Sequence, residues 1–179
     1  MPTNKKLNGT LRAFIARQHM FFVATAAPEG RVNLSPKGLD SLRILDDRRI
    51  LWLNLSGSGN ATAAHLRESP RMTLMFMSTE GDPMILRVYG SAQAYHPGDD
   101  GWEGMAAHFP QMAGTRQIFD MGVELVQTSC GTGVPFFDYK GPRGETELVP
   151  FFYQMGPDGV RDYWQRKNAI SLDGKPTGI

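Results

Sequence analysis

The stretch from Leu53 to Leu66 reads LNLSGSGNATAAHL and decides how the rest of the chain is interpreted. An apolar run typical of a buried strand stops at a turn of serines and glycines, and a helix-like run begins directly after it. Asn60 is a favourable N-cap for that helix. The stretch therefore predicts a strand, a tight turn and the start of a helix.

This turn is a candidate site for an anionic group. Glycines let a backbone approach a ligand closely, and the first N–H groups of a helix would point toward it. The hydroxyl groups of Ser56, Ser58 and Thr62 would add donors. The turn lacks the Lys of the nucleotide-hydrolase phosphate loop, and its glycine spacing differs from the dinucleotide-binding fingerprint. A turn without any ligand is the alternative interpretation.

Composition places the chain among globular proteins that bind small molecules or other proteins. Its 179 residues are 41% hydrophobic and 21% charged, with a formal net charge of +1. A domain of this length buries enough surface to support its own core, so we expect a single domain over 1–179. Because the net charge is near zero, we expect no nucleic-acid partner.

Other features argue against disulfides, metals and membranes. Cys130 has no second cysteine to pair with, and the four histidines show no metal-ligand spacing. Cys130 is either a reactive thiol near the functional groove or a small apolar residue. No apolar run approaches the ~20 residues that span a bilayer. We therefore expect no structural metal, no membrane contact and a cytoplasmic location.

Short strands joined by turns flank the central stretch. Before it, we expect a helix from Leu7 to His19 and a hairpin formed by Met20 to Ala26 and Arg31 to Ser35. Two more strands are expected, at Leu42 to Leu45 and Ile50 to Leu55. Pro36 to Gly38 is expected to interrupt the hairpin. After it, we expect strands at Met72 to Ser78, Ile85 to Tyr95 and Phe119 to Val126, with a bulge or bend at Gly90 in the second of them. One helix is expected from Pro97 to Phe109. The pattern predicts a mostly β fold with peripheral helices, arranged as a closed or partly closed antiparallel barrel.

Residues 129–179 read as a helical and extended C-terminal extension of this domain. A second glycine-rich loop runs from Ser129 to Pro135, and Glu145 to Arg166 predicts two short helices separated at Gly156 and Pro157. Lys167 to Ile179 has no periodicity. We expect an extended tail there, which is either a disordered end or an arm laid over a partner subunit.

Five segments together resemble a known family. They read FFVATAAPEGRVNLSPKG, LNLSGSGNATAAHLRESPRMTLMF, ILRVYG, VQTSCGTGVP and KNAISLDGKPTGI. The combination, spread over nearly the whole chain, is similar to the FMN-binding split-barrel proteins related to pyridoxamine phosphate oxidase. The resemblance implies an antiparallel Greek-key split β-barrel that forms a homodimer, with FMN in a groove between the two subunits. It also implies that the flavin ring lies along the second strand and the phosphate at the turn after the fourth.

The resemblance assigns cofactor contacts residue by residue. The strand along the flavin ring and ribityl chain would comprise Asn33, Leu34, Ser35, Pro36 and Lys37. The phosphate would lie beside Leu55, Ser56, Asn60, Ala61 and Thr62.

The chain departs from the oxidase at two places. The Arg and Lys that hold the phosphate in the oxidase are replaced here by Ala61 and Thr62. Neutral hydrogen bonds would then hold the anion, each about half as strong as a charge-assisted one, unless Arg87, Lys167 or a partner residue supplies a charge. The helix that recognises the substrate phosphate in the oxidase has no arginine here, so we do not expect pyridoxamine phosphate as the substrate.

Two functional hypotheses follow. The first is an FMN-binding oxidoreductase with an unknown small-molecule substrate or electron donor, in which the flavin performs the redox chemistry. The second is a non-enzymatic flavin- or haem-binding module, such as a redox sensor or cofactor carrier. No paired acid and base residues stand out in the sequence, and this keeps the second hypothesis open.

Overall fold

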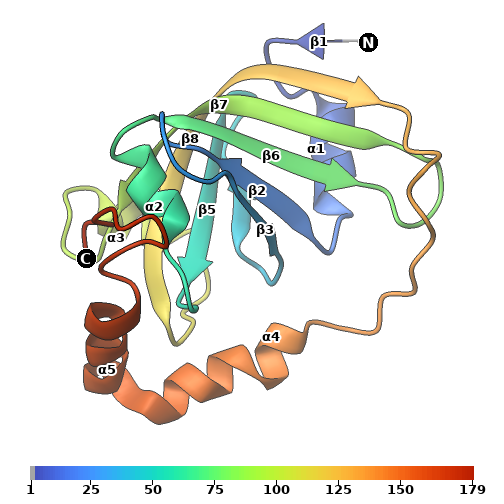
Figure 1. Cartoon of the computed structure of the whole chain (residues 1–179). Coiled ribbons are helices and arrows are strands. Elements are labelled where there is room, and N and C mark those ends of the chain that lie inside the picture. The colour runs from blue at the N-terminus through green and yellow to red at the C-terminus, as the bar shows by residue number, and fades with distance from the viewer. Residues whose placement is uncertain (1–2) are drawn as a thin grey trace.

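The computed structural model describes residues 3–179 of the chain. Within these residues, eight strands form one antiparallel sheet that curls into a half-barrel (Figure 1). The strands are β1 (Thr3–Asn4), β2 (Phe21–Thr25), β3 (Asn33–Lys37), β4 (Leu42–Ile44), β5 (Arg49–Leu55), β6 (Arg71–Met77), β7 (Ile85–Tyr95) and β8 (Thr115–Ser129). The helices are α1 (Gly9–Ala16), α2 (Ala61–Leu66), α3 (Trp102–Ala106), α4 (Arg143–Thr146) and α5 (Leu148–Lys167).

The strand order leaves the barrel open on one side. Along the sheet the order is β3-β2-β6-β7-β8-β5-β4, with β1 attached to β8, so β3 and β4 form the two ends. Each end strand pairs with a single neighbour in the described structure, β3 with β2 and β4 with β5. The prediction of a mostly β, antiparallel split barrel is therefore confirmed.

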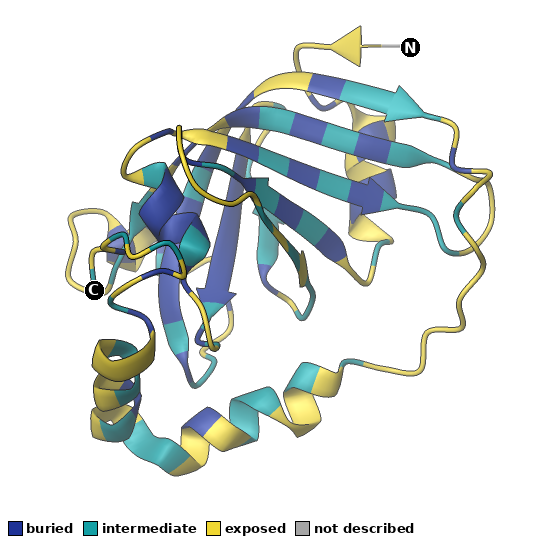
Figure 2. Ribbon diagram, in the orientation of Figure 1, coloured by how far each residue is buried: buried dark blue, intermediate teal, exposed yellow. Residues whose placement is uncertain are grey.

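Strand β5 is covered on both faces, which explains its continuous apolar sequence. Ile50 and Trp52 belong to the main core, together with the buried face of α1, whereas Leu51 and Leu53 pack with Trp102 of α3 on the opposite face. Strands β2, β6 and β7 alternate between buried and less buried residues along most of their length (Figure 2). This rigid strand carries the turn that begins at Ser56.

The predicted bulge at Gly90 is confirmed. The pairing of β7 with β8 shifts register between Tyr89 and Gly90. A Cβ added to Gly90 would lie 1.9 Å from the carbonyl oxygen of Gly122, so only glycine permits this close approach of the two strands.

Three predicted boundaries were wrong. Strand β3 continues through Pro36 and Lys37, because an end strand tolerates a residue without an N–H group. The helix predicted from Pro97 begins only at Trp102, since Gly98 and Gly101 have positive φ angles of 97° and 85°. Strand β8 begins at Thr115, before its apolar run, because pairing with β5 extends it to that residue, whereas its pairing with β7 begins at Ile118.

The C-terminal extension runs from the end of β8 around the open side of the barrel to α4 and α5 (Figure 1). Helix α5 breaks at Gly156, whose φ of 71° and ψ of 168° are not helical, so the predicted break is confirmed. The tail after α5 is ordered against its own chain, with Asn168 and Thr177 fully buried. The expectation of a disordered end is therefore wrong.

Candidate functional site

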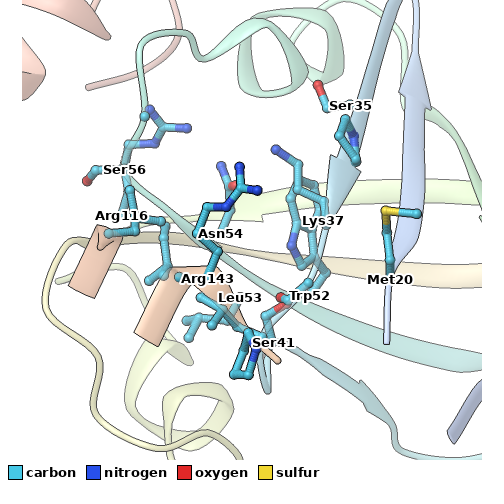
Figure 3. A pocket seen from close by; sticks show the side chains of 18 of the residues that line it. Met20, Ser35, Lys37, Ser41, Trp52, Leu53, Asn54, Ser56, Arg116 and Arg143 are labelled. Carbon is cyan, nitrogen blue, oxygen red and sulfur yellow. The ribbon is translucent and has the colours of Figure 1, made fainter. Parts of the chain in front are cut away.

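A cavity of about 800 Å³ lies at the open side of the barrel, within the range of small-molecule sites. It is bounded by β3, by β5 with the turn after it, and by the loop that leads into α4 (Figure 3). Nine of the residues assigned from the resemblance line it: Asn33, Ser35, Pro36, Lys37, Leu55, Ser56, Asn60, Ala61 and Thr62. The structure therefore brings the predicted ring strand and the predicted phosphate turn to one cavity.

Three residues of the same prediction do not reach the cavity lining. Leu34 has 63% of its surface exposed and alternates with the lining residues Asn33 and Ser35 along β3. Arg87 lies on β7 and donates from Nη1 to Oγ of Ser129 at 3.1 Å. Lys167 is the exposed last residue of α5. The two basic residues proposed to replace the missing phosphate ligands are thus placed elsewhere.

Lys37 is a cation inside the cavity. Its Nζ lies 5.3 Å from the ring centroid of Trp52, which is within the range of a cation–π contact (Figure 3). Within residues 3–179 it has no ion pair with a carboxylate. Burial, and secondarily the positive charge of Arg116, lower the pKa of Lys37 from 10.5 to about 8.

This shift predicts a pH-dependent stability. Below pH 8 Lys37 is charged in both the folded and the unfolded chain, so folding buries a charge; above 10.5 it is neutral in both. The destabilisation is therefore present at low pH and disappears as the pH rises from about 8 to 10.5. We expect Lys37→Met to be more stable than wild type by about 2 kcal/mol at pH 7 and to lose most of that advantage by pH 10. Urea unfolding of both proteins across this range measures the difference, and parallel pH profiles would contradict it.

The side chain of Ser56 supports the fold and has no proton to offer an anion. Its hydroxyl donates to the Gly114 carbonyl at 2.7 Å and accepts from Nε1 of Trp164 at 2.6 Å. Its backbone N–H also donates to the Gly114 carbonyl. The expectation that this hydroxyl would be a phosphate donor was wrong, because its single proton is already used.

Asn60 also differs from the prediction. Its side chain makes no capping hydrogen bond to α2; instead Oδ1 accepts from Gln117 at 2.7 Å and Nδ2 donates to the Asn168 carbonyl at 3.4 Å. Helix α2 has only six residues, so its dipole is small. Thr62 is different, because its Oγ1 accepts from Nδ2 of Asn33 at 3.1 Å and its own proton remains available to a ligand.

Arg116 supplies the charge that the sequence interpretation lacked at this turn. It lies on β8, lines the cavity and is only 2% exposed. Its Nη1 donates to the Gly59 carbonyl at 3.0 Å, while its Nε is buried without a hydrogen-bond partner in residues 3–179. Burial lowers the pKa of Arg116 to about 10, which still leaves the guanidinium charged at neutral pH. A buried cation without an anionic partner is unfavourable, so this group favours an anion from outside the described chain.

The charges around the whole cavity also favour an anionic ligand. Its lining includes Lys37, Arg116 and Arg143 and, among residues 3–179, no Asp or Glu. Arg143 belongs to α4, and the preceding loop places Tyr139 against His19, with ring centroids 3.7 Å apart. The C-terminal extension thus contributes a cation and an aromatic residue that sequence reasoning missed, because residues 136–144 carry no regular pattern.

The structure gives less support to a reactive thiol, a metal site or a membrane-spanning helix than to an anion site. Cys130 is exposed, and hydrogen bonds with Thr132 lower the pKa of its thiol. In the described part of the chain no group of three or more His, Cys, Asp or Glu side chains is arranged to hold a metal ion. Among the described helices, none combines the length and apolar character needed to cross a membrane.

A family model described as pyridoxamine 5'-phosphate oxidase matches residues 7–130. The chain belongs to the pyridoxamine 5'-phosphate oxidase family. A curated member, the pyridoxamine 5'-phosphate oxidase family protein ustO of Aspergillus flavus, is 31% identical over 188 residues, which cover 96% of this chain and 76% of that protein.

Solved structures share the fold at low sequence identity. HupZ of Group A Streptococcus aligns with a TM-score of 0.54 and 18% identity, covering 74% of this chain and 99% of that chain. HutZ of Vibrio cholerae, described as a haem storage protein, aligns with a TM-score of 0.50 and 16% identity, covering 71% and 98%. At such identities the likeness concerns the fold, and the pyridoxamine 5'-phosphate oxidase family is established by the sequence matches.

Proposed function

We propose that this member of the pyridoxamine 5'-phosphate oxidase family is an FMN-binding oxidoreductase. The observation that carries the proposal is Arg116, a buried cation with an unpartnered Nε in a cavity whose described lining has no carboxylate. A phosphate group satisfies such a guanidinium better than a neutral ligand does. FMN differs from riboflavin by one phosphate, so this site would favour FMN.

The residues present fit this cofactor. Arg116 and the hydroxyl of Thr62 would hold the phosphate beside the turn of residues 56–60. The polar side of β3 and the indole of Trp52 would line the ring, with Lys37 at its edge. The bound flavin would supply hydride or electron transfer. The protein's own residues would orient it, exclude water and, through Lys37, place a cation or a proton donor beside the substrate.

We also propose that the partner is a second copy of the chain. Large apolar side chains remain exposed at one end of the sheet and on the C-terminal extension: Val32, Leu34, Phe136, Phe137, Phe151, Tyr153, Ile170 and Leu172. Exposed apolar side chains of this kind favour association with another protein surface, and homodimers are the commonest case. The other ligand would be a small-molecule substrate or electron donor in the same cavity.

A haem-binding module is the second candidate function. Its support is the lining residue His19, whose imidazole is a common iron ligand, and the fold shared with the haem storage protein HutZ. A cationic cavity also suits the carboxylates of haem. This candidate predicts haem affinity without turnover, whereas the oxidoreductase predicts a reducible bound flavin.

Spectroscopy of the purified chain tests the proposal. We expect the protein loaded with FMN to show a flavin absorption band that bleaches with NADH or NADPH under nitrogen and returns in air. Sedimentation of the same sample at micromolar concentration should give a dimer. A flavin that stays bound and never turns over would favour a carrier. A protein that takes up haem and ignores FMN would contradict the oxidoreductase.

A further inference from the structure

The C-terminal end of the chain holds the turn beside the proposed phosphate site. We define the C-terminal clasp as residues Trp164 to Thr177, the end of α5 and the tail after it. We propose that Trp164 and Asn168 of this clasp are positioning residues for anion binding: they fix the turn of residues 56–60 so that Arg116 faces the ligand. This inference rests on the proposed function, because it assigns the cofactor phosphate to that turn.

The clasp makes direct hydrogen bonds to the turn. Trp164 donates from Nε1 to Oγ of Ser56 at 2.6 Å, and Asn168 donates from Nδ2 to the Gly57 carbonyl at 2.8 Å. The carbonyl of Asn168 accepts from Nδ2 of Asn60 at 3.4 Å. These bonds join residues that lie 108 to 111 positions apart in the sequence.

Besides these contacts, the turn is held by hydrogen bonds of Ser56 to Gly114, Gly59 to Arg116 and Asn60 to Gln117. Gly57 and Gly59 restrict the backbone less than any other residue would. A Cβ added to either glycine would meet nothing within 4 Å, so neither is packed tightly against a neighbour. The turn therefore depends on hydrogen bonds from distant residues for a single conformation.

Arg116 depends on the same turn. Its Nη1 donates to the carbonyl of Gly59. Gly59 lies between Ser56, which accepts a hydrogen bond from Trp164 of the clasp, and Asn60, which accepts one from Gln117. If the turn moves, this anchor moves with it, and the guanidinium loses the position that faces the cavity. A preorganised cation binds an anion more tightly than one that must be ordered on binding.

The clasp is itself fixed to other parts of the chain by ion pairs. Asp173 pairs with the guanidinium of Arg31 and accepts from its backbone N–H at 2.8 Å, and Lys175 pairs with Glu68 at 2.6 Å. The side chain of Thr177 donates to the Asn168 carbonyl at 2.6 Å. The tail thus connects the barrel surface to the turn. It lies outside residues 7–130, which the family model matches.

The test measures the affinities of the full-length protein for FMN and for riboflavin. Trp164→Phe keeps an aromatic ring and removes the N–H donor to Ser56. We expect it to weaken FMN binding by about three- to tenfold, the range of one net hydrogen bond, and to leave riboflavin binding within about twofold. Trp102→Phe, the same change at the buried tryptophan of α3, is the matched control and should change neither affinity.

A second variant identifies the route of the effect. Ser56→Ala removes the acceptor of the same hydrogen bond and also the bond that the hydroxyl donates to Gly114, so it should weaken FMN binding selectively and at least as much as Trp164→Phe. If Trp164 acts through Ser56, the double variant should lose little more than Ser56→Ala alone. Ser56→Ala also decides the question if Trp164→Phe does not fold.

The outcomes separate this inference from the proposed function. Equal losses for FMN and riboflavin, or no loss in either foldable variant, would overturn the positioning role. If Arg116→Gln still removed the preference for FMN, the phosphate site itself would stand. A wild-type protein that binds FMN and riboflavin equally would overturn both.

Discussion

Replacing Arg116 by Gln should weaken FMN binding by about ten- to 150-fold while leaving riboflavin binding within about twofold. The range corresponds to the roughly 1.5 to 3 kcal/mol of one hydrogen bond between charged groups. Glutamine retains an amide near the Gly59 carbonyl, with which Arg116 is hydrogen bonded at 3.0 Å, and it removes a buried charge. Since the described chain provides no carboxylate for that charge, the apo variant should be no less stable than wild type.

The matched control is Arg87→Gln. Arg87 is the arginine that the sequence suggested as a replacement phosphate ligand, and the structure places it on β7 beside Ser129. We expect its substitution to leave both affinities unchanged. Fluorescence titration of the two flavins against both variants measures the four values. If Arg87→Gln reduced FMN affinity and Arg116→Gln did not, the phosphate would lie elsewhere.

Thr62→Glu should also abolish the preference for FMN. The new carboxylate would lie against the phosphate, with a repulsion of roughly 1 to 4 kcal/mol at ~4 Å for effective dielectrics between those of water and a protein surface. We expect a loss in FMN affinity of about five- to several-hundredfold, whereas riboflavin, which has no phosphate, should be nearly unaffected.

Thr62→Val separates the charge from the loss of the hydroxyl. Valine has nearly the shape of threonine but can neither donate to a ligand nor accept from Asn33, which lies 3.1 Å from the hydroxyl. We expect a loss of only about two- to tenfold for FMN, in keeping with one neutral hydrogen bond. Circular dichroism checks that each variant folds. Equal losses for FMN and riboflavin in Thr62→Glu would show that residue 62 affects the cavity in general and not the phosphate.

The stretch from Leu53 to Leu66 folds largely as predicted. Strand β5 ends at Leu55 and α2 begins at Ala61, because a strongly apolar run, two glycines and a helix-forming sequence follow one another locally. The split barrel and the convergence of β3 with this turn were also predictable, since five separate segments resemble one family.

The chemistry of the turn was harder to predict. Ser56 and Asn60 are polar residues in a turn, and such residues form hydrogen bonds either with a ligand or with other parts of the chain. Their partners are Gly114, Gln117, Trp164 and Asn168, which lie 57 to 108 residues away along the chain. No local pattern shows which role a residue has when its partner is that distant.

Arg116 was missed for a related reason. It precedes the apolar run of β8, so periodicity began the strand at Phe119. Only the pairing with β5 draws Thr115 to Gln117 into the sheet. An arginine followed directly by Gln117 and then an apolar run was the signal in the sequence. Such a residue at the start of a buried strand is a candidate ligand for an anion.

The most direct test of the central claim is a crystal structure of the chain with FMN bound. We predict that the flavin phosphate lies within about 2.7 to 2.9 Å of guanidinium nitrogens of Arg116, the usual length of a charge-assisted hydrogen bond. The ring should lie along β3 beside Trp52 and Lys37. A phosphate bound away from Arg116, with the turn of residues 56–60 empty of ligand, would contradict the account.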